Sequence, residues 1–426
     1  AFPLPFRALF LIGLGILGWA ANLHGLHVFG VDAVRVFDLG TDADDDINHA
    51  LHHIGHSRRQ LPDPKSVYQP IYRLAAFYCS WCFAAWVLYH LAVEGDPALV
   101  DVYKFIPSLC ALSFIILVLA PQNVLARLHR DSFILGLKRC LFSPVDRPVF
   151  FSDIVFADVI TSYAKVIGDV WLSLCMLLPG GSLLIPPRQE GLARWILPTV
   201  MSLPSAIRMR QCLIEWMQPT TDSSRPLFNA LKYASAFPVI YLSAAQRLVV
   251  SDLVAEKGKQ VTQEPWHGEH ALFRLWLLFA AINSLYSFWW DITNDWGFDL
   301  LLPPADKRPV SPPRPLVLPS LHERSESLTG SPTRSSASIR TLSRTSSSYA
   351  WGLRSSLLFP LAVYPAAIFI DLVLRLTWVV KLSSHLHTHA SEGSALVFLL
   401  EVAEIFRRWM WVFIRVEWEV IRSQPG

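Results

Sequence analysis

The chain has 426 residues, of which 52% are hydrophobic and only 17% are charged. A soluble globular protein carries about 25% charged residues, so this composition excludes an ordinary soluble domain. The net charge of +3 indicates no particular partner, and we expect no binding to nucleic acid.

The apolar residues gather in runs of roughly 20, the length that crosses the hydrocarbon layer of a bilayer. Because "LFLIGLGILGWAANL" near the start lacks a convincing cleavage site, we interpret it as a first span and not as a signal peptide. The runs predict an all-α polytopic membrane protein, a bundle of about nine or ten transmembrane helices. The predicted spans are residues 6–30, 72–94, 103–121, 153–178, 195–217, 227–250, 271–297, 355–382 and 394–421.

Two of the connections between spans are basic, and both are predicted to be cytosolic by the positive-inside rule. Residues 122–152 contain "LHRDSFILGLKRCLF", which predicts an amphipathic helix at the membrane surface. Residues 302–352 are rich in Ser, Pro and Arg, which predicts a disordered loop with candidate phosphorylation sites. The C-terminus is then cytosolic and the N-terminus lies on the opposite side, although one missed segment would reverse that assignment.

This pattern divides the chain into two parts. Residues 1–152 are predicted to form a scaffold of N-terminal membrane helices with the amphipathic surface segment. Residues 153–426 are predicted to form a transport core, interrupted by the loop at about 302–352.

The most informative residues are ionisable side chains inside the predicted spans, because a charge there is costly unless it is paired or used. Asp291 and Asp295 lie one turn apart in "WWDITNDWGFD". Other spans contribute Asp158, Asp169, Arg208, Lys232 with Tyr233, Asp371, Arg375 with Trp378, Glu404, Arg407, Arg408, Arg415 and Glu417.

If these basic residues converge on one cavity, the aspartates neutralise them and positive charge remains for an anion. Arginine suits phosphate because its planar fork donates two parallel hydrogen bonds. The alternative is that the charges are buried ion pairs that fix helix register, with Asp371–Arg375 and Glu404–Arg408 as pairs four residues apart. Trp378 is a candidate gate residue or a packing anchor.

Two other patterns have simpler explanations. His49, His52, His53 and His56 share one helix face after an acidic run, a spacing that can bind a transition metal but also suits a solvated turn. "CSWC" at 79–82 has redox spacing, but it lies within a membrane span. The sequence contains no P-loop, dinucleotide fingerprint or H-E-x-x-H motif, so we predict neither an enzyme nor a cofactor.

Three segments resemble the EXS domain of eukaryotic phosphate exporters: "LPSAIRMRQCLIEW…LFNALKYASAFP", "FWWDITNDWGF" and "EIFRRWMWVFIRVEWE". The resemblance runs from about Pro5 to the C-terminus. Larger members carry a soluble inositol-pyrophosphate sensor before the spans. This chain begins almost at its first span, so it is similar to the short fungal Golgi form, whose loss impairs ER retention and glycosylation.

The resemblance implies roles for matching positions. Arg375, Arg407 and Arg408 match arginines that coordinate phosphate, and Lys232 with Tyr233 matches a pair that lines the pathway. The remaining matches are Asp158, Asp291, Asp295 and the gate tryptophan at Trp378. We add Arg208 to the candidate site because it lies inside a predicted span. The family usually has an amide near Thr161, and the basic run after Arg208 is replaced here by "IEWMQPT".

From these features we expect a passive or channel-like phosphate transporter of the Golgi membrane. It would return lumenal phosphate from glycosylation to the cytosol and so support glycosylation and the retention of Golgi and ER proteins. The alternative is a sorting factor that recycles Golgi glycosyltransferases through its cytosolic segments. Expected partners are inorganic phosphate and the lipid bilayer, with glycosyltransferases, coat machinery and a second copy of the chain as further candidates.

Overall fold

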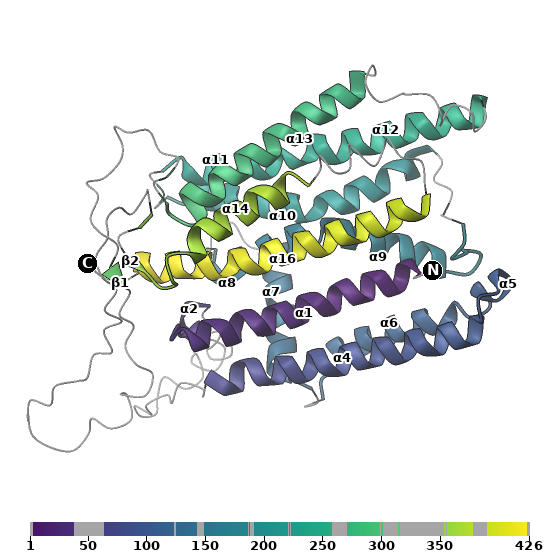
Figure 1. Ribbon diagram of the computed structural model, residues 1–426, viewed down its shortest axis with the longest axis horizontal. Coiled ribbons are helices and arrows are strands. Elements are labelled where there is room, and N and C mark those ends of the chain that lie inside the picture. Colours follow the sequence, from purple (N-terminus) through teal and green to yellow (C-terminus); the bar gives the residue numbers. More distant parts are fainter. Residues whose placement is uncertain are drawn as a thin grey trace, which may run out of the picture.

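The protein is an all-α membrane protein, seen in a computed structural model as a bundle of long helices that run side by side (Figure 1). The structure describes residues 3–37, 64–122, 125–142, 149–185, 187, 191–219, 221, 223–257, 271–298, 300, 314–315, 353–354, 356–377 and 390–423. The N end and the C end lie at opposite ends of the bundle (Figure 1).

Most helices of the described residues follow the predicted apolar runs, and several lie in the connections between them. In the first part they are α1 (Leu4–Val28), α2 (Ala33–Val36), α4 (Pro64–Val93), α5 (Pro97–Val100), α6 (Phe105–Leu119) and α7 (Arg127–Phe142). The second part contains α8 (Phe151–Ser162), α9 (Ala164–Leu177), η1 (Gly191–Trp195), α10 (Ile196–Met217), α11 (Arg225–Ala234), α12 (Ala236–Lys257), α13 (Ala271–Trp290), η3 (Asp291–Asp295), α14 (Val363–Arg375) and α16 (Ala390–Ser423). Strands β1 (Arg314–Pro315) and β2 (Ser356–Leu357) form a short parallel pair.

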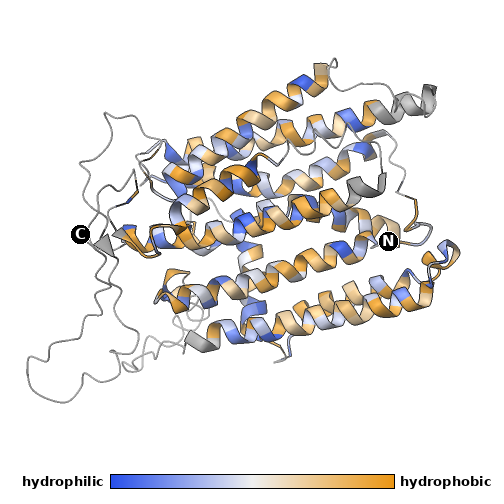
Figure 2. Ribbon diagram, viewed as in Figure 1, coloured by the Kyte–Doolittle hydropathy of each residue, from blue (hydrophilic) through white to orange (hydrophobic). Residues whose placement is uncertain are grey.

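Hydropathy differs between the helices. Within the described residues, four segments are long and apolar enough to cross a membrane by length and composition, and the bent pair α8–α9 is a fifth candidate. Hydrophobic residues dominate α4 and α6, whereas hydrophilic residues interrupt α14 and α16 (Figure 2). The interruptions are the buried charges described below, so these helices face the bundle interior with part of their surface.

Helix α7 lies within residues 122–152, where the sequence predicts an amphipathic helix at the membrane surface. Arg130 is 2% exposed, and its guanidinium donates to the carbonyl oxygens of Ala120 and Gln122, both at 2.9 Å. It therefore caps the C-terminal end of α6, where carbonyls lack partners within the helix. At the other end of α7, Arg139 donates from Nε to Oδ2 of Asp153 at 2.9 Å and so attaches α7 to α8.

The predicted span 153–178 is broken near its middle. Helices α8 and α9 meet at Tyr163 with a bend of 63°. The hydroxyl of Thr161 donates to the carbonyl oxygen of Asp158 at 2.7 Å, a contact with the preceding turn that commonly bends helices. The bend matters because it turns the hydroxyls of Thr161 and Ser162 into the bundle, toward α16.

The end of α13 changes from α-helix to the π-helical turn η3. The Trp296 amide donates to the carbonyl oxygen of Asp291 at 2.8 Å, five residues back, and the turn ends at Gly297 with φ of +66°. Such π turns are rare and are frequent at functional sites. Because the turn is wider than an α-helical one, Asp291 and Asp295 lie closer to one face, and both are buried.

Replacing Gly297 with alanine is expected to destabilise the protein by about 3 kcal/mol, through the left-handed backbone and an added overpacking cost. A Cβ atom at this position would lie 2.6 Å from the Trp418 ring of α16. Gly95→Ala is the matched control, because Gly95 also has a positive φ, of +84°, but nothing within 4 Å of the added atom. Thermal unfolding in detergent measures both, and equal losses would show that packing against Trp418 is unimportant.

Candidate anion site

Charged side chains from α8, α10, α11, η3, α14 and α16 meet inside the bundle as one connected network. They come from elements far apart in the sequence, and most are less than 10% exposed. The sequence-predicted residues that the structure brings together are Asp158, Arg208, Lys232, Tyr233, Asp291, Asp295, Arg375, Arg407 and Arg408.

The carboxylate of Asp291 is the acidic centre of the network and is fully buried. Arg375 donates from Nη2 to its Oδ2 atom, and Arg407 Nη1 lies 3.6 Å from the same oxygen. The Lys232 ammonium lies 3.6 Å from Asp291 Oδ1 and 3.3 Å from Asp295 Oδ2. Asp291 thus neutralises parts of three cations, whereas Asp295 shares only Lys232.

A second carboxylate, Asp371, joins α14 to α16. It accepts from Arg375 Nε at 3.0 Å and from Arg407 Nη1 at 3.1 Å. Arg407 also forms a two-pronged contact with Glu404, from Nε at 3.0 Å and from Nη2 at 2.6 Å. Each of these two arginines is therefore held by two or more carboxylates, which fixes its orientation.

The third part of the network lies between α8, α10 and α11. Arg208 donates from Nε to Asp158 Oδ1 at 3.0 Å, and the Tyr233 hydroxyl donates to the same oxygen. Arg208 also donates to Gln211 Oε1 at 3.3 Å. The Lys232 ammonium also lies 4.8 Å from the centre of the Tyr233 ring, a cation–π contact. The guanidinium of Arg208 thus already has two partners, the carboxylate of Asp158 and the side-chain amide of Gln211.

Arg408 differs from the other cations. Its Nε donates to the Ser162 hydroxyl at 3.0 Å and its Nη2 to the Thr161 hydroxyl at 3.2 Å. Its guanidinium stacks 4.6 Å from the Trp411 ring centre. Among the residues that the structure describes, no carboxylate lies within ion-pair distance of Arg408, although the side chain is buried. Arg408 therefore has positive charge that no neighbouring carboxylate neutralises directly.

The predicted pair Glu404–Arg408 is wrong. Glu404 accepts instead from Arg407 and, at 2.8 Å, from Ser162. Side chains four residues apart share a helix face, but side chains three residues apart, such as Glu404 and Arg407, are neighbours as well. The bend after α8 decides the outcome, because it places two hydroxyls at Arg408. The predicted Asp371–Arg375 pair is present.

The comparisons with known proteins identify the family of this chain. A family model described as the EXS family matches residues 2–421. The chain belongs to the EXS family.

Several EXS-family relatives are similar over nearly the whole chain. Protein ERD1 homolog 1 of Schizosaccharomyces pombe is 27% identical, over 99% of this chain and 92% of its own length. Protein ERD1 homolog 2 of the same organism is 24% identical, over 97% of this chain and 95% of its own length. Human solute carrier family 53 member 1 is 22% identical over 97% of this chain, which spans only 49% of that longer protein.

Some sequence-based predictions lie outside the described residues of this EXS-family chain. They are the gate tryptophan Trp378, the histidine face His49–His56 and the loop 302–352, apart from Arg314 and Pro315. The described residues contain no group of three metal-binding side chains. Sequence reasoning missed Ser162, whose hydroxyl links Arg408 to Glu404. No local pattern distinguishes Ser162, because its role depends on the bend beside it.

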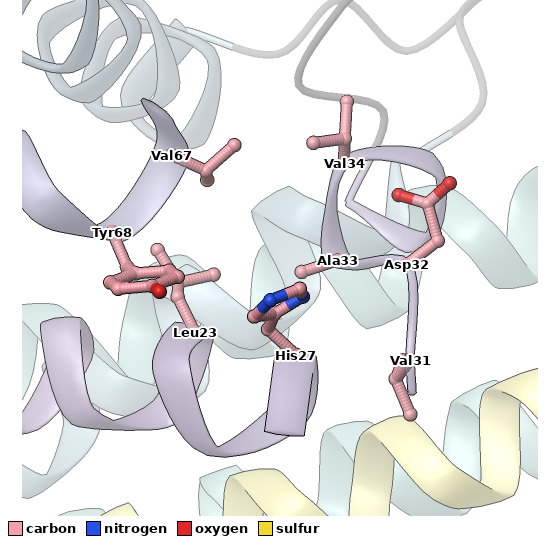
Figure 3. A pocket seen from close by; sticks show the side chains of 8 residues that line it. All are labelled: Leu23, His27, Val31, Asp32, Ala33, Val34, Val67 and Tyr68. Carbon is pink, nitrogen blue, oxygen red and sulfur yellow. The ribbon is translucent and has the colours of Figure 1, made fainter. Parts of the chain in front are cut away.

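A small cavity lies apart from the charged network, between α1, α2 and α4. His27 and Tyr68 project into it beside Leu23, while Asp32 lies at its edge (Figure 3). Its volume of about 20 Å³ accommodates a single water molecule. It is too small for phosphate, so the charged network is the better candidate for an anion site.

Proposed function

We propose that this protein is a channel-like or passive transporter of inorganic phosphate in the Golgi membrane. It would return lumenal phosphate from glycosylation to the cytosol, and so support glycosylation and the retention of Golgi and ER proteins. The observation that carries the proposal is Arg408, a buried arginine that donates to two hydroxyls and has no carboxylate within ion-pair distance in the described part of the chain. The ERD1-named relatives and the solute carrier support the same direction.

The chemistry around Arg408 suits a tetrahedral oxyanion. A guanidinium fork donates in a plane that matches two phosphate oxygens. The hydroxyls of Thr161 and Ser162 can rotate to donate to further oxygens. Thr161 replaces the amide that the family resemblance leads us to expect, and it keeps both a donor and an acceptor. The seat therefore offers several hydrogen bonds to one anion.

Weak holding is as important as recognition, because a transported ion must also leave. Neighbouring cations are shared between carboxylates: Lys232 lies near Asp291 and Asp295, and Arg407 contacts Asp371 and Glu404. When phosphate binds, these cations can turn toward it, and their ion pairs with the carboxylates form again when phosphate leaves. We propose that residues 153–426 form this transport core, with residues 1–152 as its scaffold.

Reconstitution tests the proposal directly. We expect the purified protein in liposomes to accelerate the movement of labelled phosphate down its gradient by at least about tenfold over protein-free liposomes. Liposomes containing heat-denatured protein serve as the second control. Equal phosphate movement with and without folded protein would overturn the transporter.

The alternative function, a sorting factor for Golgi glycosyltransferases, gives the opposite pattern. It depends on the cytosolic segments, above all residues 302–352, and not on Arg408. Deleting residues 305–350 would then abolish enzyme retention in cells, while Arg408→Ala would leave retention intact. The transporter predicts loss of retention with Arg408→Ala.

A further inference from the structure

A second cluster of buried charges lies along α9 and α16, beyond the anion seat at Arg408. Glu401 precedes Arg408 by two helical turns, about 10 Å along α16. Lys165 and Asp169 lie one turn apart on α9, directly after the bend. The Lys165 ammonium contacts Asp169 and lies 3.5 Å from Glu401 Oε1. None of these three residues was assigned to the anion site.

Among the described residues, three of the four carboxylate oxygens of this cluster lack a hydrogen-bond donor, and the fourth, Asp169 Oδ1, accepts from Lys165. Glu401 is 6% exposed and Asp169 1% exposed. Among the residues that the structure describes, both oxygens of Glu401 and the Oδ2 atom of Asp169 have no hydrogen-bond partner. A buried ionised carboxylate without donors is costly, whereas a protonated one is neutral and supplies a donor of its own. Two buried carboxylates around one ammonium, with three oxygens lacking donors, therefore favour the binding of one proton by one of the acids.

Other charged residues that face the cluster do not supply the missing hydrogen bonds to Glu401 and Asp169. Arg7 of α1 acts electrostatically on Glu401, but its guanidinium also stacks 5.5 Å from the Phe398 ring centre. Glu404, the next acid along α16, is held by Arg407 and Ser162. Lys165 remains the one cation within 4 Å of both acids among the described residues, and its side chain is 35% exposed.

The anion network explains why a proton site is useful. Its five cations, Arg208, Lys232, Arg375, Arg407 and Arg408, face five carboxylates, Asp158, Asp291, Asp295, Asp371 and Glu404. The empty network is thus close to neutral, and phosphate adds one or two negative charges. A nearby acid that takes up a proton offsets that excess.

We propose that Glu401, Asp169 and Lys165 form a proton-binding site that is coupled to the passage of phosphate past Arg408. One proton adds to the carboxylate pair as the anion enters, and it leaves when the anion departs. This inference rests on the proposed transport function. It assigns the proton that offsets the charge of phosphate to residues outside the anion seat.

The test compares phosphate flux into proteoliposomes at about pH 7.5 and at about pH 5.5. Phosphate itself titrates in this range, but that effect is common to all variants and cancels when their ratios are compared. Glu401→Gln carries a neutral side chain that stands in for the protonated acid. We expect its flux ratio between the two pH values to differ from that of the wild type by about fivefold or more. Glu401→Asp keeps a titratable group and should restore the pH dependence.

Glu419→Gln is the matched control, because it makes the same change on α16 at a residue paired with Arg415 and Arg422. It should keep the wild-type ratio. If Glu401→Gln keeps that ratio too, the proton site is overturned while transport stands. Should Glu401→Gln fail to fold, Asp169→Asn replaces it with the same expectation.

A second readout does not depend on transport. The infrared spectrum of the wild-type protein should contain a band of a buried protonated carboxyl group that Glu401→Gln lacks. If the wild type moves no phosphate at either pH, the proposed function fails, and the infrared difference decides the proton site by itself. Identical spectra for the wild type and Glu401→Gln would overturn the proton site.

Discussion

Replacing Arg408 with alanine is expected to reduce phosphate flux at low phosphate concentration by about 100-fold, or roughly 2.8 kcal/mol. The change removes the one arginine of the network without a carboxylate partner among the described residues. Because no carboxylate is left unpaired, we expect the protein to fold as well as the wild type. Initial rates of labelled phosphate uptake and thermal unfolding in detergent measure the two effects.

Two variants sharpen the Arg408 experiment. Arg422→Ala removes an arginine from the same helix, where its side chain is 49% exposed and pairs with Glu419, so it should leave flux unchanged. Arg408→Lys keeps the charge but loses the planar fork, and it should recover only part of the flux. If Arg408→Ala transports at the wild-type rate, the anion seat lies elsewhere in the bundle.

Replacing Asp291 with asparagine is expected to destabilise the protein by about 3–5 kcal/mol, the usual cost of breaking a buried ion pair. Lys232, Arg375 and Arg407 all lie within 4 Å of this carboxylate. Without it, their charges remain buried and insufficiently neutralised. The measurement is the midpoint of thermal unfolding, together with the yield of monodisperse protein.

Asp295→Asn is the matched control for Asp291. Asp295 is 7% exposed and shares only Lys232, which keeps Asp291 as a partner. We expect it to lose about 1 kcal/mol and to fold, so its effect appears in phosphate flux. Equal stability of the two variants would contradict the central role of Asp291. A double variant that adds Arg375→Met to Asp291→Asn should regain part of the stability, because one unpaired cation is removed.

Pattern reasoning found the helices and most of the charged residues because both depend on local sequence. A run of about 20 apolar residues has few stable alternatives to a membrane helix. Charges inside such runs are rare enough to indicate function, and nine of the ten predicted site residues lie in one network. The tenth, Trp378, lies outside the described residues.

Partnerships within the network could not be predicted in the same way. The sequence assigns Asp291 and Asp295 the same role, since they are one turn apart with similar neighbours. Their difference arises from η3, where a π turn and the cations of three other helices surround Asp291 more fully. Glu404 was likewise paired with the wrong arginine, because spacing along α16 does not show what α8 places beside Arg408.

By itself, then, the sequence determined an all-α membrane protein with ionisable residues inside its spans, because hydrophobic length and the cost of buried charge act locally. Tertiary structure alone decided which cation of the network has no carboxylate within ion-pair distance among the described residues. That property depends on the 63° bend at Tyr163, which directs Thr161 and Ser162 toward Arg408. A charge-assisted hydrogen bond needs close and well-directed contact, so a bend of one helix changes which charged groups form direct pairs.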